Sequence, residues 1–216
     1  MIKVSGVVEE IITSDQIALE ALRGNVLNLS AYAKRIQQEV EKRTVKPVKH
    51  GTIVVALSRI IPKLSPLKPL KPEVIIDDIS IKSPLCELTY EKTTDVLRRA
   101  QTLSLKNISH QDFFTSTQGL HEITIVCNEA FRREITSHFV IKPKSSFRNL
   151  VAITVRFSKE YLEVPNIMYT LINQIASRRI NIIEIISTYT ELSFIVKKEN
   201  MGKSLEALTP HFRGME

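Results

Sequence analysis

The stretch "RRINIIEIISTYTELSFIV", Arg178–Val196, decides how the C-terminal part of the chain folds. It follows an amphipathic segment, predicts a strand, a turn and a second strand, and is apolar on both faces of its first half. The residues expected to face helices are Val151, Ile153 and Val155 of an earlier strand and Ile180, Ile182 and Ile186 of this one. The other face then carries Ile183, Ile185 and Tyr189, and an apolar second face near a sheet edge needs a cover. We expect a partner for this strand; the alternative is cover by the N-terminal part of the same chain.

The segments around this stretch predict the order strand, helix, strand, strand, helix. "NLVAITVRFS", Asn149–Ser158, alternates apolar and polar residues as a strand does, and a helix is expected from Pro165 to about Arg178. The apolar stripe of that helix is Met168, Leu171, Ile172, Ile175 and Ala176. The same order is predicted earlier in the chain, where the expected elements are Ile79–Glu91, about Thr94–Leu105 with Val96, Leu97, Ala100 and Leu103 inward, Asp112–Thr117 and His121–Val126.

These two segments form an internal repeat. "EITIV" from Glu122 and "ELSFIV" from Glu191 each lead into a helix, and these helices end in "SHF" at Phe139 and "PHF" at Phe212. The offsets are 69 and 73 positions, too long for a solenoid unit and suited to a duplicated small α+β domain. A weak break at "KPKSSF", residues 142–147, separates the copies.

The run from Val164 to Phe212, "VPNIMYTLINQIASRRINIIEIISTYTELSFIVKKENMGKSLEALTPHF", resembles an ACT domain, most closely the regulatory ACT units of aspartate kinases. The matching positions are Val164, Pro165 and Asn166, then Ile180, Asn181 and Ile182, then Ser187, Leu192, Ser193 and Val196. The resemblance implies two ferredoxin-like βαββα units that pair edge to edge with another ACT unit, as a homodimer or higher oligomer. It also implies regulation without catalysis.

The family binds small effectors, usually amino acids, where paired units meet. Free amide groups at a helix start suit a carboxylate, and backbone groups of a neighbouring strand suit an ammonium. By resemblance the contacts are Glu163, Val164, Pro165, Asn166 and Ile167, with Asn181 and Ile182 opposite. Asn166 replaces the family's usual glycine; it tolerates a left-handed backbone but adds a side chain. The first copy, "YEKTTDVL" from Tyr90, has neither proline nor glycine there and is expected to be structural, and a pair of ACT units that binds no ligand is the alternative.

The positive charge of the chain gathers in its first third. The net charge is +7, and residues 1–72 hold 12 Lys and Arg against 6 Asp and Glu. Four prolines within "IPKLSPLKPLKPE", Ile61–Glu73, are expected to end the last helix and form an extended linker. The predicted domains are thus 1–64, a linker at 65–73, a first ACT-like unit at 74–142 and a second at 147–216. A basic domain beside a neutral one is typical of a nucleic-acid-binding module, with a solvated basic surface as the alternative.

The first 61 residues predict three helices. These are Val7–Asn25, a helix capped by Ser30, and Lys49–Ile61. The patterns "LSAYAKRI" and "GTIVVALSRI" resemble a winged helix-turn-helix, although no wing hairpin is visible before Pro72. By that resemblance the candidate DNA contacts are Lys34, Arg35, Lys46, Lys49, His50, Thr52 and Arg59. Such three-helix domains also serve as protein-docking units.

Other functional signals are missing from the sequence. It contains none of the phosphate-binding, zinc-protease or nucleophile-elbow motifs, and no kinase domain opening. Cys86 and Cys127 form no metal motif and are expected to be inert core thiols, and no cofactor is expected. Without a leader or a long apolar run, a cytoplasmic protein with no membrane partner is expected. The sequence therefore predicts an effector-responsive DNA-binding regulator, or a non-catalytic scaffold that docks on an enzyme of amino-acid biosynthesis.

Overall fold

The chain forms two compact units, residues 1–72 and 73–216. The structure, a computed structural model, describes residues 3–64 and 70–211. Most of the predicted linker, residues 65–69, lies outside the described residues, and so does Phe212 of the "PHF" repeat.

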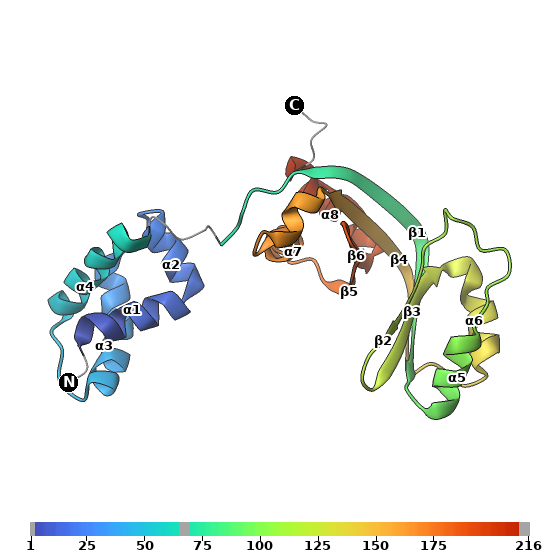
Figure 1. Cartoon of the computed structure of the whole chain (residues 1–216), viewed down its shortest axis with the longest axis horizontal. Coiled ribbons are helices and arrows are strands. Elements are labelled where there is room, and N and C mark those ends of the chain that lie inside the picture. Colours follow the sequence, from blue (N-terminus) through green and yellow to red (C-terminus); the bar gives the residue numbers. More distant parts are fainter. Residues whose placement is uncertain (1–2, 65–69, 212–216) are drawn as a thin grey trace. The chain divides into compact units, whose positions relative to one another are not determined.

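The N-terminal unit is built from four helices rather than three. They are α1 (Val4–Ser14), α2 (Gln16–Arg23), α3 (Leu29–Thr44) and α4 (His50–Leu64), and they enclose one apolar core (Figure 1). The single helix predicted over Val7–Asn25 is interrupted at Asp15, whose carboxylate accepts a hydrogen bond of 3.1 Å from the backbone N–H of Ala18. Asn28, and not Ser30, caps α3 by the same means. A short polar side chain at each N-cap satisfies donors that the helix leaves free, which explains both starts.

Pro62 does not end α4, contrary to the sequence prediction. The helix continues to Leu64 with the proline in its last turn. A proline removes one backbone donor and crowds the preceding turn, and close to a helix end this disturbs few hydrogen bonds. Residues 3–64 contain no strand, so the described part of this unit has no wing hairpin.

The C-terminal unit contains the predicted repeat of strand, helix, strand, strand and helix. The first copy comprises β1 (Ile76–Glu91), α5 (Thr94–Thr102), β2 (Phe114–Gln118), β3 (Glu122–Asn128) and α6 (Arg132–Phe139). The second comprises β4 (Ser145–Phe157), α7 (Ile167–Ser177), β5 (Ile182–Ser187), β6 (Glu191–Lys197) and α8 (Met201–Leu208). The six strands form one antiparallel sheet in the order β2-β3-β1-β4-β6-β5, which confirms the predicted α+β class for this unit.

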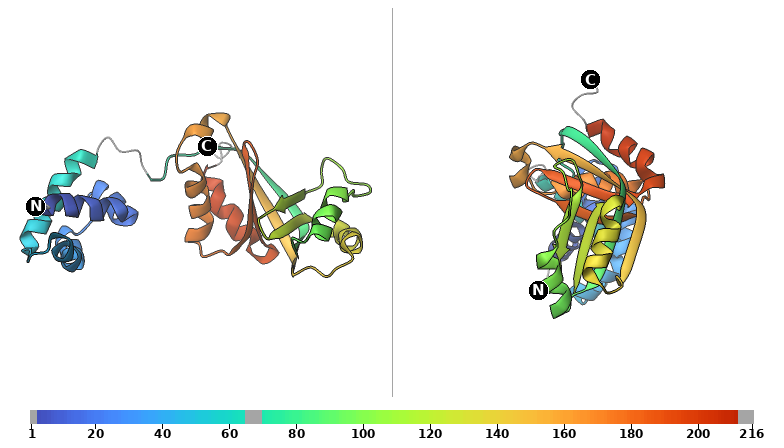
Figure 2. Two further views of the ribbon diagram at one scale, coloured as in Figure 1. Left: turned by 60° about the horizontal axis from the view of Figure 1, so that its bottom comes forward. Right: turned by 90° about the vertical axis from the view of Figure 1, so that its right-hand side faces the viewer.

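The two copies join through their long first strands. β1 pairs with β4 from Ile76–Phe157 to Thr89–Ser145, and the two strands run side by side across the unit (Figure 2). A complete ferredoxin-like unit has four strands, and each copy has three of its own. Each copy therefore uses the first strand of the other as its fourth, so the tandem pairing leaves β5 and β2 at the outer edges.

All four helices cover one face of this sheet. Val151 and Ile153 of β4 pack toward α7 and α8, and Cys86 and Leu88 of β1 pack toward α5 and α6. The residues between them in sequence point to the opposite face. There the apolar cluster consists of Leu85, Val126, Leu150, Ala152 and Ile195, with Phe113, Ile183 and Ile186 packed against it. No helix residue belongs to this second cluster in the described part of the chain.

The predicted faces of β5 are corrected by a register shift between Ile182 and Glu184. After the shift Ile185 lies opposite Phe194, a residue of the helix-side core, and Ile186 joins Ile183 on the helix-free face. Tyr189 lies in the turn after the strand and is exposed. The shift reverses the alternation that a regular strand keeps, and so Ile186 and Ile185 exchange the faces assigned from the sequence.

Candidate functional site

The first turn of α7 offers free backbone donors at the predicted ligand site. Asn166 adopts the left-handed conformation, with φ 71° and ψ 11°, and its side chain makes no capping hydrogen bond. Ile167 is buried in the helix-side core, and Val164 packs against that core, so both hold the turn in place. Glu163, Pro165 and Asn166 are exposed. The first N–H groups of a helix have no partner within it and favour an anion, so this turn can receive a carboxylate.

The corresponding turn of the first copy is closed by its own side chains. Thr93 Oγ1 accepts a hydrogen bond of 3.2 Å from the backbone N–H of Val96, and Asp95 adds a negative charge to the first turn of α5. α7 has no acidic residue in its first turn. The start of α5 is thus capped and carries a negative charge, whereas the start of α7 has neither feature.

Asn181 and Ile182 lie at the other end of α7 from this turn. They stand at the start of β5, just after the helix has ended at Ser177. An eleven-residue helix is about 16 Å long, so one copy cannot close both groups around one small molecule. Within one chain, β5 occupies the sheet edge and pairs, among the described residues, with β6 alone.

The candidate DNA contacts of the N-terminal unit separate into three groups. Lys34 and His50 line one hollow of about 550 Å³ between α3 and α4, together with Asn28, Ser30, Ala31 and Gln37. The His50 ring nitrogen Nε2 lies 3.0 Å from the carbonyl oxygen of Ser30, which holds the start of α4 beside the start of α3. Four further candidates are exposed. Lys46 and Lys49 lie between α3 and α4, and Thr52 and Arg59 lie on α4. The side chain of Arg35 lines a different hollow.

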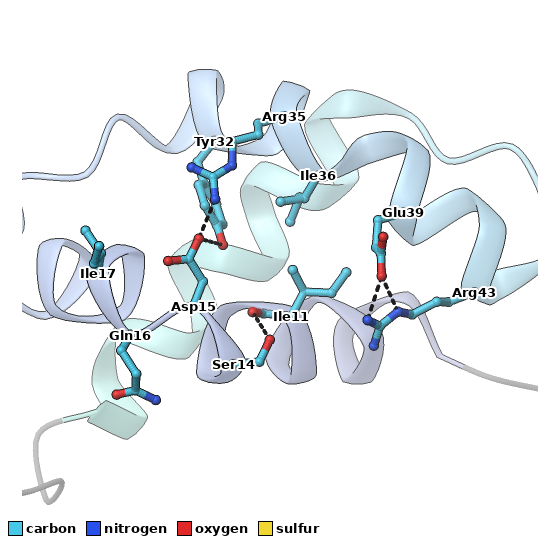
Figure 3. Close-up of a pocket in the computed structure, with 10 residues that line it drawn as sticks. All are labelled: Ile11, Ser14, Asp15, Gln16, Ile17, Tyr32, Arg35, Ile36, Glu39 and Arg43. Atoms are coloured by element: carbon cyan, nitrogen blue, oxygen red, sulfur yellow. Dashed lines mark hydrogen bonds and ion pairs between the residues drawn. The ribbon is translucent and has the colours of Figure 1, made fainter. Parts of the chain in front are cut away.

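Arg35 belongs to a second hollow, between α1, α2 and α3. Its Nη2 lies 2.6 Å from Asp15 Oδ2, and the Tyr32 hydroxyl donates a hydrogen bond of 3.2 Å to the same oxygen (Figure 3). Burial, with the Asp15 charge adding to it, raises the pKa of Tyr32 to about 12. Asp15 was not predicted from the sequence, although its place between two apolar helical segments is a capping signal. Arg35 is therefore engaged within the unit.

A buried carboxyl group on the helix-free face of the sheet was also missed. Glu87 of β1 is 6% exposed, and its Oε2 has no hydrogen-bond partner in the described structure. Burial, with the charge of Glu184 on β5 adding to it, raises the pKa of Glu87 to about 7, against the opposing effect of a hydrogen bond with Thr89. Alternation along β1 is the only sequence signal for this position.

Neither a cluster of metal-ligating side chains nor a membrane-spanning helix is found in the described part of the chain. No group of three His, Cys, Asp or Glu side chains is placed to hold a metal ion within residues 3–64 and 70–211. In the same ranges, no helix has the length and apolar character needed to span a bilayer.

No family model matches the sequence, and no curated protein is significantly similar to it. Solved structures do show similarity. The regulatory subunit of aspartate kinase from Thermus thermophilus, in its ligand-free form, has a TM-score of 0.50 and 11% identity over 65% of this chain and 99% of its own. The regulatory subunit from Thermus flavus has a TM-score of 0.50 and 12% identity over 63% and 98%. Aspartate kinase of Clostridium acetobutylicum, described as an allosteric enzyme, has a TM-score of 0.53 and 14% identity over 64% of this chain and 35% of its own.

These structures match 63–65% of this chain, which is close to the share that the C-terminal unit occupies. The resemblance to the regulatory ACT units of aspartate kinases is thus confirmed at the level of the fold. The winged-helix resemblance of the N-terminal unit stays a prediction.

Proposed function

We propose that this chain is a non-catalytic regulatory protein whose C-terminal unit binds a free amino acid. The observation that carries the proposal is the open first turn of α7, in a unit that shares its fold with aspartate kinase regulatory subunits. Only the second copy starts its first helix without a side-chain cap, because in the first copy Thr93 Oγ1 accepts a hydrogen bond from the N–H of Val96 and Asp95 places a negative charge nearby. The ligand carboxylate is expected at the turn from Glu163 to Ile167.

The ligand ammonium is expected at backbone groups of Asn181 and Ile182 of a second chain. Within one chain these residues lie about one helix length from the turn. The free edge of β5 allows two chains to pair side by side, since an unpaired edge offers a row of backbone donors and acceptors. Ligand binding and self-association are then linked, and this linkage supplies the regulatory response.

A thermal-shift screen of the full chain against the common amino acids tests the proposal. A true ligand at about 100 times its dissociation constant stabilises the folded state by roughly 2.7 kcal/mol. The Asn166→Gly variant should change the affinity and still fold, because glycine adopts the left-handed conformation of this position readily. A flat screen across all amino acids would instead favour an ACT pair that binds no ligand.

A second proposal concerns the N-terminal unit, which we infer to bind DNA. It is favoured by exposed cations that the protein does not use internally: Lys49 and Arg59 make no ion pair with any residue in the described ranges. His50 follows Lys49 directly at the start of α4 and lines one hollow together with Lys34 of α3. Cations in such positions suit phosphate groups. Docking on an amino-acid biosynthesis enzyme is the competing function of this unit.

A gel shift with DNA from upstream of the protein's own gene, repeated over a range of salt concentrations, separates these two functions. DNA binding through phosphate groups weakens steeply with salt. The double variant Lys49→Ala with Arg59→Ala should reduce the slope of log affinity against log salt by about one unit for each phosphate that the protein no longer binds. If the protein does not bind DNA even at low salt, docking on an enzyme remains as the function of this unit.

A further inference from the structure

The two cysteines of the chain face each other inside the first copy of the C-terminal unit. Cys86 of β1 and Cys127 of β3 are direct partners in the antiparallel register, and their sulfur atoms lie 3.6 Å apart. Both side chains are fully buried in the core that β1 and β3 form with α5 and α6. The sequence contains no other cysteine. Their spacing of 41 positions gave no sign of this contact.

The backbone at this pair already suits a disulfide bond. Directly opposite residues of an antiparallel pair have Cα atoms about 4.5 or 5.5 Å apart, and disulfides span about 4.4–6.8 Å between Cα atoms. To reach the bond length of about 2.05 Å, the sulfurs must approach by roughly 1.5 Å. Small rotations about the two χ1 angles provide that movement without a change of register.

The two thiols are not equivalent. Their mutual hydrogen bond lowers the pKa of Cys86, against the opposing effect of burial, and Arg132 and Arg148 lower it further. The same hydrogen bond raises the pKa of Cys127, and burial adds to that shift. The thiolate is the reactive form of cysteine, so we take Cys86 as the expected nucleophile of the pair and Cys127 as the thiol next to it.

We propose that a peroxide oxidises Cys86 and Cys127 to a disulfide bond that joins β1 to β3. The Cys86 thiolate attacks one peroxide oxygen, the O–O bond breaks, and Cys86 becomes a sulfenic acid while the second oxygen leaves as water after taking a proton. The Cys127 sulfur then attacks the Cys86 sulfur, the S–O bond breaks, and the departing hydroxide takes the Cys127 proton as water. Two thiols lose two electrons in total, and hydrogen peroxide is reduced to two waters.

Complete burial selects the oxidant by size. Hydrogen peroxide is little larger than water and needs only a small local opening to reach the pair, whereas a bulky disulfide would need the core to separate. The bond closes a loop that contains α5 and β2, so it restrains the first copy alone. The open turn of α7 lies in the second copy, outside this loop, so oxidation should leave its structure unchanged.

The test treats the full chain with hydrogen peroxide. The intact mass should fall by two hydrogen atoms, and dithiothreitol should restore it. Trypsin cleaves after Lys92 and Lys106, between the two cysteines, so an unreduced digest should contain the Cys86 and Cys127 peptides joined. The melting temperature of the oxidised unit should rise by about 5–10 °C, because the crosslink restricts the unfolded chain.

The Cys127→Ser variant checks the order of the steps. Without a second thiol the Cys86 sulfenic acid should persist, and dimedone should trap it as a stable adduct. The wild-type mass and peptide analysis decides the proposal even if this variant folds poorly. Thiols that stay reduced at peroxide doses that consume free cysteine, separate oxidation of each thiol to higher acids, or a crosslink between chains would each overturn it.

Discussion

Thr93 and Asn166 occupy the same position, directly before the first helix of each copy, but only Thr93 caps its helix. Thr93 Oγ1 accepts a hydrogen bond from the N–H of Val96, whereas Asn166 has a left-handed backbone and its side chain makes no capping hydrogen bond. The second helical position differs in the same sense, with Asp95 in α5 and Met168 in α7. A duplicated element has thus kept a satisfied helix start in one copy and an open one in the other.

Transfer of the first-copy charge to the second copy should block the ligand. In the Met168→Asp variant, the new carboxylate lies near the free N–H groups and repels the carboxylate of the ligand. We therefore expect the affinity for the amino acid to fall at least tenfold. Folding should not suffer, because an acidic residue at a helix start contributes about 0.3–1 kcal/mol of stability. Isothermal titration with the ligand identified by thermal shift measures the first effect, and the melting temperature measures the second.

The matched control is the reverse exchange, Asp95→Met in α5. It removes the ion pair with Arg99, in which the two groups lie 2.8 Å apart, and leaves α7 unchanged. Ligand affinity should stay within twofold of the wild type. Equal losses in both variants would place the ligand elsewhere in the unit.

The free edge of β5 predicts self-association. Ile185 is part-exposed on this outermost strand, and Tyr189 is exposed in the turn that follows it. We expect a homodimer or higher oligomer by light scattering at tens of micromolar, and Ile185→Lys should shift it toward monomer because a charge blunts edge pairing. The two copies already pair through β1 and β4, so a monomeric wild type would show that this internal pairing is sufficient.

The exposed and buried faces of α4 should respond differently to truncation. Leu57 is fully buried in the N-terminal core, and Leu57→Ala should destabilise this unit by about 2–5 kcal/mol. Arg59 is exposed, so Arg59→Ala should leave stability unchanged and weaken DNA binding. Arg35→Ala is the comparison, because that arginine is held by Asp15 and should affect DNA binding less. Gel shifts and thermal melts measure both properties, and equal binding losses for the two arginines would contradict the assignment.

Most residues with a clear period were predicted correctly from the sequence; Met168 and Ala176 of α7 were predicted to face inward and are exposed. The stripe of Val96, Leu97, Ala100 and Leu103 packs inward on and just after α5, and the alternating strand of Val151, Ile153 and Val155 faces the helices. Such patterns fix the face of an element because burial of a whole apolar set outweighs local preferences. The class of the C-terminal unit followed from this repeat.

Local irregularities were not predicted. The break at Asp15, the helical Pro62 and the register shift after Ile182 each involve one or two residues that no longer follow the period around them. The contact between Cys86 and Cys127 depends on how β1 registers with β3, which the spacing of the residues in sequence does not determine. The position of Glu87 depends on tertiary structure in the same way.

The buried Glu87 predicts that the C-terminal unit loses stability as pH rises. Its pKa is about 7 in the folded unit and 4.5 in the unfolded chain, so the folded state favours the protonated form. The contribution is fully present below pH 4.5 and is lost as pH rises through 7, at up to about 1.4 kcal/mol for each pH unit in between. Glu87→Gln keeps the shape without ionising, and should melt at a higher temperature than the wild type at pH 8. Below pH 4.5 this advantage should disappear.

Glu184→Gln provides the matched control for this prediction. It removes the neighbouring charge on β5 and leaves Glu87 buried, so the pH at which stability declines should move downward while the decline itself remains. Scanning calorimetry of the full chain between pH 4 and pH 8.5 measures the transition of the C-terminal unit for all three proteins. Parallel profiles for the wild type and Glu87→Gln would mean that Glu87 ionises in the folded unit as it does in water. Its unpartnered oxygen would then be solvated in solution, and the helix-free face of the sheet would open to water around β5.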